Sequence, residues 1–245
     1  MFEDDLEVKV RSGHRPNDTI NAVKCTLCET RKPRRFCPGV NNQICAPCCG
    51  EARENTVSCP IACEYLLEAR QHEQYIQADP RSIPNMDINL TEEYLERIDP
   101  IVGLFARFLV GAYVETEGTV DQDMRDAIEA LVKTYRTRQS GLIYDSMSEN
   151  AIAASVQQKV SAALAEFIKT VEEKTGSANV FRDADILGAL VFWQRFALHV
   201  NNGRRRGRAF ITILIDRAIR MEHQMQARAA ASAADSTDGP TLVTP

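Results

Sequence analysis

Eight cysteines crowd into one short stretch of this chain, and they restrict its fold more than any other feature. All of them lie between Cys25 and Cys63 in a sequence of 245 residues. A segment this small cannot bury enough apolar surface to fold alone, so cross-links or metal ions must stabilise it. The rest of the chain has no cysteine, and the composition, 44% hydrophobic and 26% charged, is ordinary. We therefore expect a small cysteine-dependent module joined to a larger domain with a conventional core.

The compartment decides whether the cysteines form disulfides or bind metal. The chain begins Met1-Phe2-Glu3-Asp4-Asp5, which is acidic and polar, whereas a secretory signal has a basic start followed by an apolar run. The most hydrophobic segment, 186–200, is interrupted by Gln194 and Arg195 and is too short to span a membrane. These features predict a cytoplasmic protein without membrane contact, in which thiols stay reduced and clustered cysteines bind metal.

The spacing of the cysteines predicts zinc sites. Two CxxC pairs, Cys25/Cys28 and Cys45/Cys48, are separated as in tetrahedral sites where each pair forms a tight turn and both turns share one ion. Four further cysteines remain for a second, interleaved site: Cys37, Cys49, Cys59 and Cys63. We expect two structural Zn²⁺ ions, each contributing roughly 10–16 kcal/mol to the folding of the module.

Other ligand sets stay open at this point. A single zinc ion would leave four cysteines unused, and His72 or His14 could replace one cysteine ligand. A redox CxxC site needs a helix that follows a strand in a βαβ unit, and the neighbouring sequence lacks that pattern. A catalytic zinc ion would favour histidine or carboxylate ligands and an open position. The cysteine-only donor set therefore predicts a structural ion.

The interleaved pairs resemble the treble-clef and cross-brace zinc modules, a broad group that includes the RING-like, MYND-like and HIT-type zinc fingers. Two segments, 44–53 (ICAPCCGEAR) and 58–66 (SCPIACEYL), are also similar to a cysteine-rich N-terminal segment of uncharacterised bacterial proteins. The resemblance covers about 45 residues and implies metal binding rather than an activity. Unlike the named fingers, this segment has no histidine within the cluster and contains the vicinal pair Cys48-Cys49.

Beyond the cysteines the sequence predicts an all-α domain of five or six helices. The expected organisation is a flexible arm (1–22), the cysteine module with a short exit helix (23–76), a linker (77–88), the all-α domain (89–228) and a disordered tail (229–245). The linker contains Pro80 and Pro84, which disfavour helix. The tail is rich in Ala, Ser and Asp and offers little to bury.

Capping motifs and apolar periodicity predict the individual helices. We expect a short helix from about residue 89 that ends at Pro100, a second from Pro100 to Glu117, and a third after the capping box at 119–122. A fourth runs from about 146 to Gly176 with one apolar stripe. The run 186–193 is apolar on nearly all sides, which is typical of a central helix. The last helix spans about 206–228, with apolar residues facing the core from Phe210 to Ile219.

Two basic segments suggest nucleic-acid binding as an alternative function. They consist of Arg31, Lys32, Arg34 and Arg35 in the cysteine module and Arg204, Arg205, Arg206 and Arg208 before the last helix. The chain as a whole carries a net charge of -5 and has a pI of about 5.5, unlike a dedicated nucleic-acid binder. The first segment could instead neutralise zinc-bound thiolates, and the second could cap the preceding helix at its C-terminus.

Motifs for catalysis are absent from the sequence. It contains no glycine-rich phosphate loop, HExxH or GxSxG, and its four histidines lie in four different segments. We therefore expect a non-catalytic zinc-binding interaction or regulatory protein whose helical domain binds another protein or self-associates. A helical enzyme with a site built from distant polar residues stays open as a third class.

Overall fold

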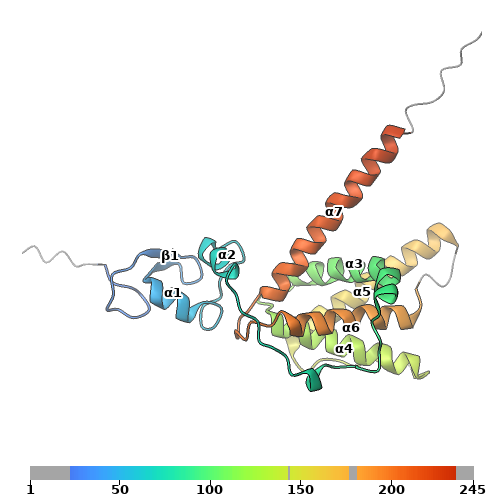
Figure 1. Ribbon diagram of the computed structural model, residues 1–245, viewed down its shortest axis with the longest axis horizontal. Coiled ribbons are helices and arrows are strands. Elements are labelled where there is room, and N and C mark those ends of the chain that lie inside the picture. Colours follow the sequence, from blue (N-terminus) through green and yellow to red (C-terminus); the bar gives the residue numbers. More distant parts are fainter. Residues whose placement is uncertain (1–22, 143, 177–180, 236–245) are drawn as a thin grey trace, which may run out of the picture. The chain divides into compact units, whose positions relative to one another are not determined.

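The computed structural model describes residues 23–142, 144–176 and 181–235 (Figure 1). The chain divides into two compact units, 1–51 and 52–245. The predicted flexible arm, 1–22, and the last part of the predicted tail, 236–245, lie outside the described residues.

The first unit is a turn, a hairpin and the start of a helix. The Cys25/Cys28 turn leads into strand β1 (Arg35–Cys37), which pairs antiparallel with β2 (Asn42–Ile44). Helix α1 (Ala46–Ala52) follows directly and begins within the second CxxC pair. The buried residues of this unit include Ile44 and most of its cysteines. So little apolar burial agrees with a unit that depends on its cysteines.

The second unit begins with short elements and continues as five long helices. Helix α2 (Glu64–Arg70) is the expected exit helix, and the linker contains one 3-10 turn, η1 (Pro80–Ser82). Cys59, Cys63 and α2, which the sequence assigns to the cysteine module, belong to this unit. The long helices are α3 (Glu92–Val114), α4 (Asp121–Gln139), α5 (Ala151–Thr175), α6 (Asp183–His199) and α7 (Ala209–Asp235).

Helix α3 corrects the prediction of two helices that meet at Pro100. It is one continuous helix with Pro100 inside it. Proline removes one backbone hydrogen bond and leaves the carbonyl of Glu96 without its helical donor. Both residues lie on the exposed side, where water can reach that carbonyl, while Ile98 and Ile101 are buried. Packing of the apolar face therefore stabilises the helix on both sides of Pro100, so the helix does not end there.

The other helix starts lie within a few residues of their predicted positions. The side chain of Thr91 accepts a hydrogen bond from the backbone of Tyr94 and caps α3. In α4 the carboxylate of Asp123 accepts from the N–H of Val120 at 2.8 Å. In α5 the cap is Asn150, which accepts from Ile152 and Ala153. Capping motifs thus located these starts but missed which polar residue acts as the cap.

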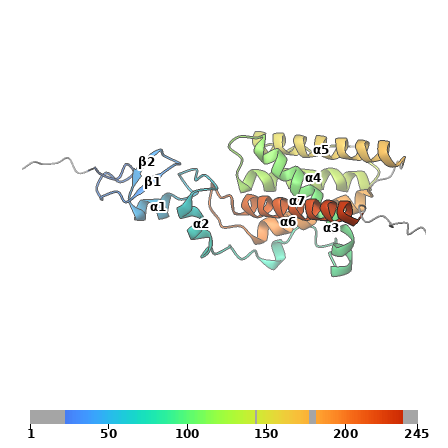
Figure 2. The same cartoon turned by 90° about the horizontal axis from the view of Figure 1, so that it is seen from above.

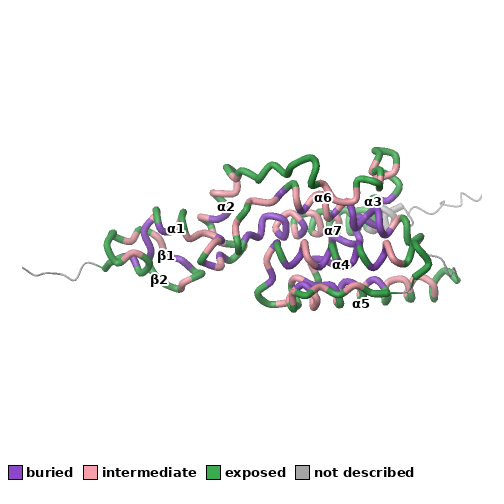
Figure 3. The backbone as a smooth tube through the Cα atoms, turned by 90° about the horizontal axis from the view of Figure 1, so that it is seen from below, coloured by how far each residue is buried: buried purple, intermediate pink, exposed green. Residues whose placement is uncertain are grey.

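The five helices enclose one apolar core (Figures 2 and 3). Helix α3 packs against α5, α6 and α7, and α4 packs against α5 and α6. Helix α6 is the central helix that its apolar run predicts, because residues 186–191 are all buried. Trp193 is 1% exposed, and its indole N–H donates to the carbonyl of Val102 at 2.9 Å. This bond satisfies the one polar atom of the largest core side chain.

Helix α7 begins and ends later than the sequence predicts. It starts at Ala209 and continues to Asp235, so residues 229–235, expected to be disordered, are helical. Phe210, Ile211 and Leu214 are buried as predicted, but Ile219 is 46% exposed. The C-terminal half of α7 projects away from the other helices in Figure 1. None of the helices in the described ranges combines the length and the apolar character needed to cross a membrane.

Candidate metal centre

The structure brings Cys25, Cys28, Cys45 and Cys48 together, as their spacing predicts. Their four sulfur atoms all lie within 4.8 Å of one another. The Sγ atoms of Cys28 and Cys45, which come from different pairs, are 3.9 Å apart. A tetrahedral zinc site with Zn–S bonds of ~2.3 Å would place its sulfurs about 3.8 Å apart. The cluster therefore has the composition and the spacing to bind one metal ion.

The backbone explains how two short sequences converge on one point. The first pair lies on a tight turn in which the N–H of Glu29 donates to the carbonyl of Cys25 at 2.7 Å. Glu29 takes a positive φ of 54° to complete this turn. The second pair opens α1, where the N–H of Cys49 donates to the carbonyl of Cys45. The hairpin between the pairs folds back, and the N–H of Thr26 donates to the carbonyl of Gln43 at 3.1 Å.

Hydrogen-bond donors surround the sulfur atoms. The backbone N–H of Cys45 donates to the Sγ of Cys25 at 3.2 Å, which links the two pairs directly. One guanidinium nitrogen of Arg31 lies 4.0 Å from the Sγ of Cys45. A guanidinium nitrogen of Arg35 lies 3.7 Å from the Sγ of Cys49. Such outer donors orient thiolate ligands and balance their negative charge.

These donors and the crowding of the thiols change the cysteine pKa values in opposite directions. Hydrogen bonds from the side chain of Thr30 and the backbone of Arg31 lower the pKa of Cys28 to about 5. Burial raises the pKa of Cys25, but backbone hydrogen bonds outweigh it and leave that pKa lowered. The neighbouring Cys45 sulfur and burial raise the pKa of Cys48 to about 12. Because four thiolates repel one another, a cation is needed to hold all four ionised.

The other four cysteines are divided between the two units. Cys37 and Cys49 lie in the first, whereas Cys59 and Cys63 lie in the second. Cys37 and Cys59 are buried. Within the described parts of the chain, the four cysteines above form the one group close enough to hold a metal ion. The predicted second site therefore stays a prediction.

Neither His72 nor His14 is placed by the structure among the metal ligands. His72 is exposed and follows α2 in the helical unit. It is not among the four clustered ligands. His14 lies outside the described residues.

The basic segment of the first unit borders the metal centre. The hydrogen bond from the guanidinium of Arg31 to Cys45, together with the charges of Cys45 and Cys28, raises the pKa of Arg31. Lys32 and Arg34 are exposed. The contacts of Arg31 and Arg35 agree with the interpretation that this segment neutralises thiolates.

The second basic segment is held by the helical unit rather than presented as a whole to solvent. Arg208 is 8% exposed, and its guanidinium donates to the carbonyls of Thr119 and Cys59 and to the hydroxyl of Ser58. Arg204 donates to the carbonyl of Arg53 at 2.7 Å. Arg205 and Arg206 are exposed. Arg204 and Arg208 therefore have structural roles. Arg205 and Arg206 are the residues of this segment that remain available to a partner.

Sequence reasoning missed the carboxylate that organises this segment. Glu54 is 0% exposed and accepts hydrogen bonds from Arg70, Asn202 and the backbone N–H of Arg208. Its own carbonyl accepts from the N–H of Arg206 at 2.7 Å. Nothing in the sequence around Glu54 indicates that it contacts residues about 150 positions later in the chain.

The comparisons with known proteins add no assignment. The chain matches no family model, no curated protein and no solved structure.

Proposed function

We propose that this is a non-catalytic zinc-binding interaction or regulatory protein in which Cys25, Cys28, Cys45 and Cys48 hold one structural Zn²⁺ ion. The observation that carries the proposal is the convergence of four sulfurs from two turns. A four-sulfur tetrahedral donor set suits zinc or an iron–sulfur cluster among the biological metals. The 3.9 Å distance between Cys28 and Cys45 sulfurs fits a single tetrahedral ion.

Three features support a structural rather than a catalytic ion. The four protein sulfurs would complete the coordination shell and leave no open position for water or substrate. Three of the four cysteines are buried. The order of turn, hairpin and helix in the first unit also supports the resemblance to treble-clef modules. The ion would fix the loops of this unit as a rigid surface for a partner, and the exposed residues Lys32, Arg34 and Phe36 would form part of it.

The metal content of the purified full-length protein tests the proposal. We expect at least one zinc ion per chain, and Cys48→Ser should remove one ion because serine is a poor ligand for zinc. Lys32→Ser, a substitution in the same unit that leaves the sulfurs intact, is the matched control and should retain the full zinc content. A protein without zinc whose thiols all react in the absence of denaturant would contradict the proposal.

The same measurement decides whether a second zinc ion is present. We propose that Cys37, Cys49, Cys59 and Cys63 hold it, and the position of Arg35 beside the Cys49 sulfur supports a thiolate there. Two ions in the wild-type protein and one in Cys59→Ser are the expected results. One ion in both proteins would reject the second site and leave the first intact.

A nucleic-acid partner is the alternative that the basic segments raise. The burial of Arg208 and the contact of Arg31 with Cys45 weigh against it. A gel-shift experiment at low salt tests it, because phosphate contacts strengthen as the salt concentration falls. We expect no shift with single- or double-stranded DNA or RNA. A shift that disappears in Arg205→Ala/Arg206→Ala would favour the alternative.

A further inference from the structure

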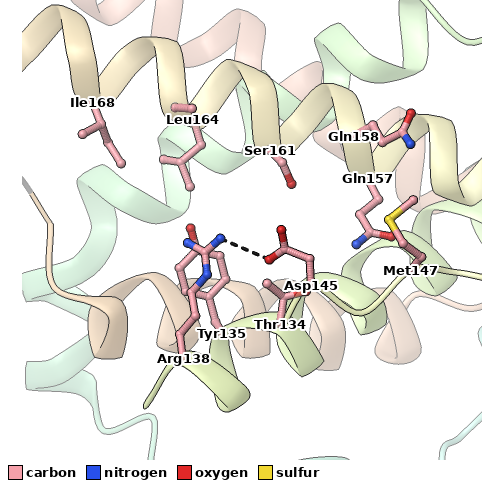
Figure 4. A pocket seen from close by; sticks show the side chains of 11 residues that line it. Thr134, Tyr135, Arg138, Asp145, Met147, Gln157, Gln158, Ser161, Leu164 and Ile168 are labelled. Atoms are coloured by element: carbon pink, nitrogen blue, oxygen red, sulfur yellow. Dashed lines mark hydrogen bonds and ion pairs between the residues drawn. The ribbon is translucent and has the colours of Figure 1, made fainter. Parts of the chain in front are cut away.

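A cavity of about 290 Å³ opens between α4 and α5 in the helical unit (Figure 4). Tyr135 and Arg138 line it from α4, while Leu164 and Ile168 line it from α5. Asp145, on the segment between the two helices, stands beside Arg138. Ligand sites for small molecules are concave and mostly apolar, with a few converging polar groups. This cavity has that composition, and its lining residues belong to the second unit, whereas the clustered cysteines belong to the first.

The hydroxyl of Tyr135 is a polar group that faces the cavity. Tyr135 is only 6% exposed, and Figure 4 shows its hydroxyl pointing toward α5. The hydroxyl makes no hydrogen bond with any described part of the chain. Burial raises the pKa of Tyr135, so the group stays protonated and remains a donor at neutral pH. The hydroxyl is therefore available to donate a hydrogen bond to a ligand oxygen in the cavity.

Arg138 supplies a positive charge next to this hydroxyl. The centre of its guanidinium lies 4.9 Å from the centroid of the Tyr135 ring. One of its nitrogens lies 3.2 Å from a carboxylate oxygen of Asp145. The side chains of Arg138 and Asp145 are 38% and 65% exposed, and an ion pair that solvent reaches so easily adds little stability. The position of Asp145 thus shows that a carboxylate fits beside Arg138. Because the ion pair is weak, a ligand carboxylate would readily displace Asp145.

The other lining residues indicate the polarity of the part of the ligand that does not contact Arg138. Leu164 and Ile168 give the α5 side an apolar surface, and the thioether of Met147 lies at the other end of the cavity. Two polar lining residues are already engaged within the protein. The hydroxyl of Thr134 donates to the carbonyl of Ala130, and the amide of Gln157 bonds to the backbone of residues 146 and 148. Ser161 and Gln158 also line the cavity from α5. A ligand would therefore meet one cationic end, an apolar wall and a few uncharged polar side chains.

We propose that this cavity binds a small carboxylic acid with a short apolar body. The ligand carboxylate would take the place of Asp145 on Arg138 and accept the hydroxyl hydrogen bond of Tyr135. The apolar body would pack against Leu164 and Ile168. The volume of about 290 Å³ lies just below the usual range for ligand sites, about 300–1,000 Å³, so we expect a small ligand. The site does not depend on the bound metal.

Titration of the full-length protein with hexanoate by calorimetry and ligand-observed NMR tests the proposal, with hexanamide as the neutral comparison. Hexanoate should bind saturably and more tightly than hexanamide, because the amide has no charge to pair with Arg138. Equal binding of the two probes, or no saturable binding of hexanoate at millimolar concentration, would overturn the proposal.

Single substitutions locate the binding site. Arg138→Gln should raise the Kd of hexanoate about tenfold, the loss expected for ~1.4 kcal/mol, and Tyr135→Phe should weaken binding by a smaller factor. Asp145→Asn should tighten binding, because it removes the competing carboxylate. Lys133→Gln, an exposed cation on the same helix that pairs with Glu129, is the control and should bind as the wild type does. Unchanged binding in Arg138→Gln, with thermal unfolding like that of the wild type, would place hexanoate elsewhere and overturn the proposal.

Discussion

At the scale of single residues, Glu54 shows how a buried charge can be fully satisfied. One carboxylate oxygen accepts from Arg70 at 2.9 Å and from the N–H of Arg208 at 3.0 Å. The other accepts from the side chain of Asn202 at 3.3 Å. The residue also takes a positive φ of 51°, which turns the chain after α1. These contacts tie residues 54–73 to the segment before α7.

Replacing Glu54 with glutamine should destabilise the protein by about 3 kcal/mol, since Arg70 would lose the closer of its two ionic partners and keep only Glu73, at 3.9 Å. The side chain of Arg70 is only 13% exposed, so water cannot replace that partner fully. Urea unfolding of the full-length protein measures the effect. Glu129→Gln is the matched control, because Glu129 forms an exposed pair with Lys133 and should change the free energy of unfolding by less than about 1 kcal/mol. Equal effects of the two substitutions would contradict the role given to Glu54.

Asp121 joins two helices through one carboxylate. It is the first residue of α4, yet its oxygens accept from the N–H groups of Phe210 at 3.0 Å and Ile211 at 3.1 Å, at the start of α7. It thus caps a helix that is remote in sequence, and no local motif in either helix reveals this contact. Burial raises its pKa from the ordinary 3.8 to about 6, although the two N–H groups act in the opposite direction.

The raised pKa of Asp121 predicts how stability depends on pH. The folded state holds this proton more tightly than the unfolded state, so the contribution of Asp121 is complete below pH 3.8 and is lost as the pH rises through about 6. The full difference amounts to about 3 kcal/mol. The stability of the wild type relative to Asp121→Asn should therefore be greater near pH 4 than near pH 7. A relative stability that stays constant or grows toward neutral pH would contradict this, and Asp99→Asn, at an exposed carboxylate, serves as the control.

At the scale of elements, apolar periodicity predicted the helices better than it predicted their ends. Val156, Val160 and Leu164 of the predicted α5 stripe are buried, and so is most of the apolar run of α6. Pro100 misled the prediction, because a proline usually ends a helix and nothing local shows that the next turns pack on the same core. Helix α7 exceeded its predicted length because residues 229–235 carry no periodic apolar signal.

Pro100→Ala should stabilise the protein by about 1–3 kcal/mol, because alanine restores the hydrogen bond to the carbonyl of Glu96 and has the higher helix propensity. Thermal and urea unfolding measure the change. Glu96→Ala, on the same exposed face of α3, controls for the new alanine and should change stability by less than about 0.5 kcal/mol. A destabilised Pro100→Ala variant would show that the proline shapes the packing of α3.

At the scale of the whole molecule, the sequence was sufficient to predict the cluster of four cysteines. It was insufficient to predict where the two units divide or where the cavity lies. The two CxxC pairs predicted the four clustered cysteines, because this motif itself forms the turn that places its sulfurs. The division of the chain at residue 51 could not be predicted, since it depends on contacts such as those of Glu54 with residues 202–208. The cavity between α4 and α5 depends likewise on how two helices pack. Spacing predicts local geometry, whereas these features arise from tertiary contacts.

We propose that a zinc ion at Cys25, Cys28, Cys45 and Cys48 holds the first unit folded. Amide NMR spectra of the uniformly labelled full-length protein, recorded before and after a zinc chelator is added, test it most directly. We expect the amide signals of residues 23–51 to lose their dispersion while those of residues 92–228 keep theirs, because the helical unit has its own apolar core. Restored zinc should restore the spectrum. Dispersed signals from residues 23–51 after complete removal of zinc would contradict the claim.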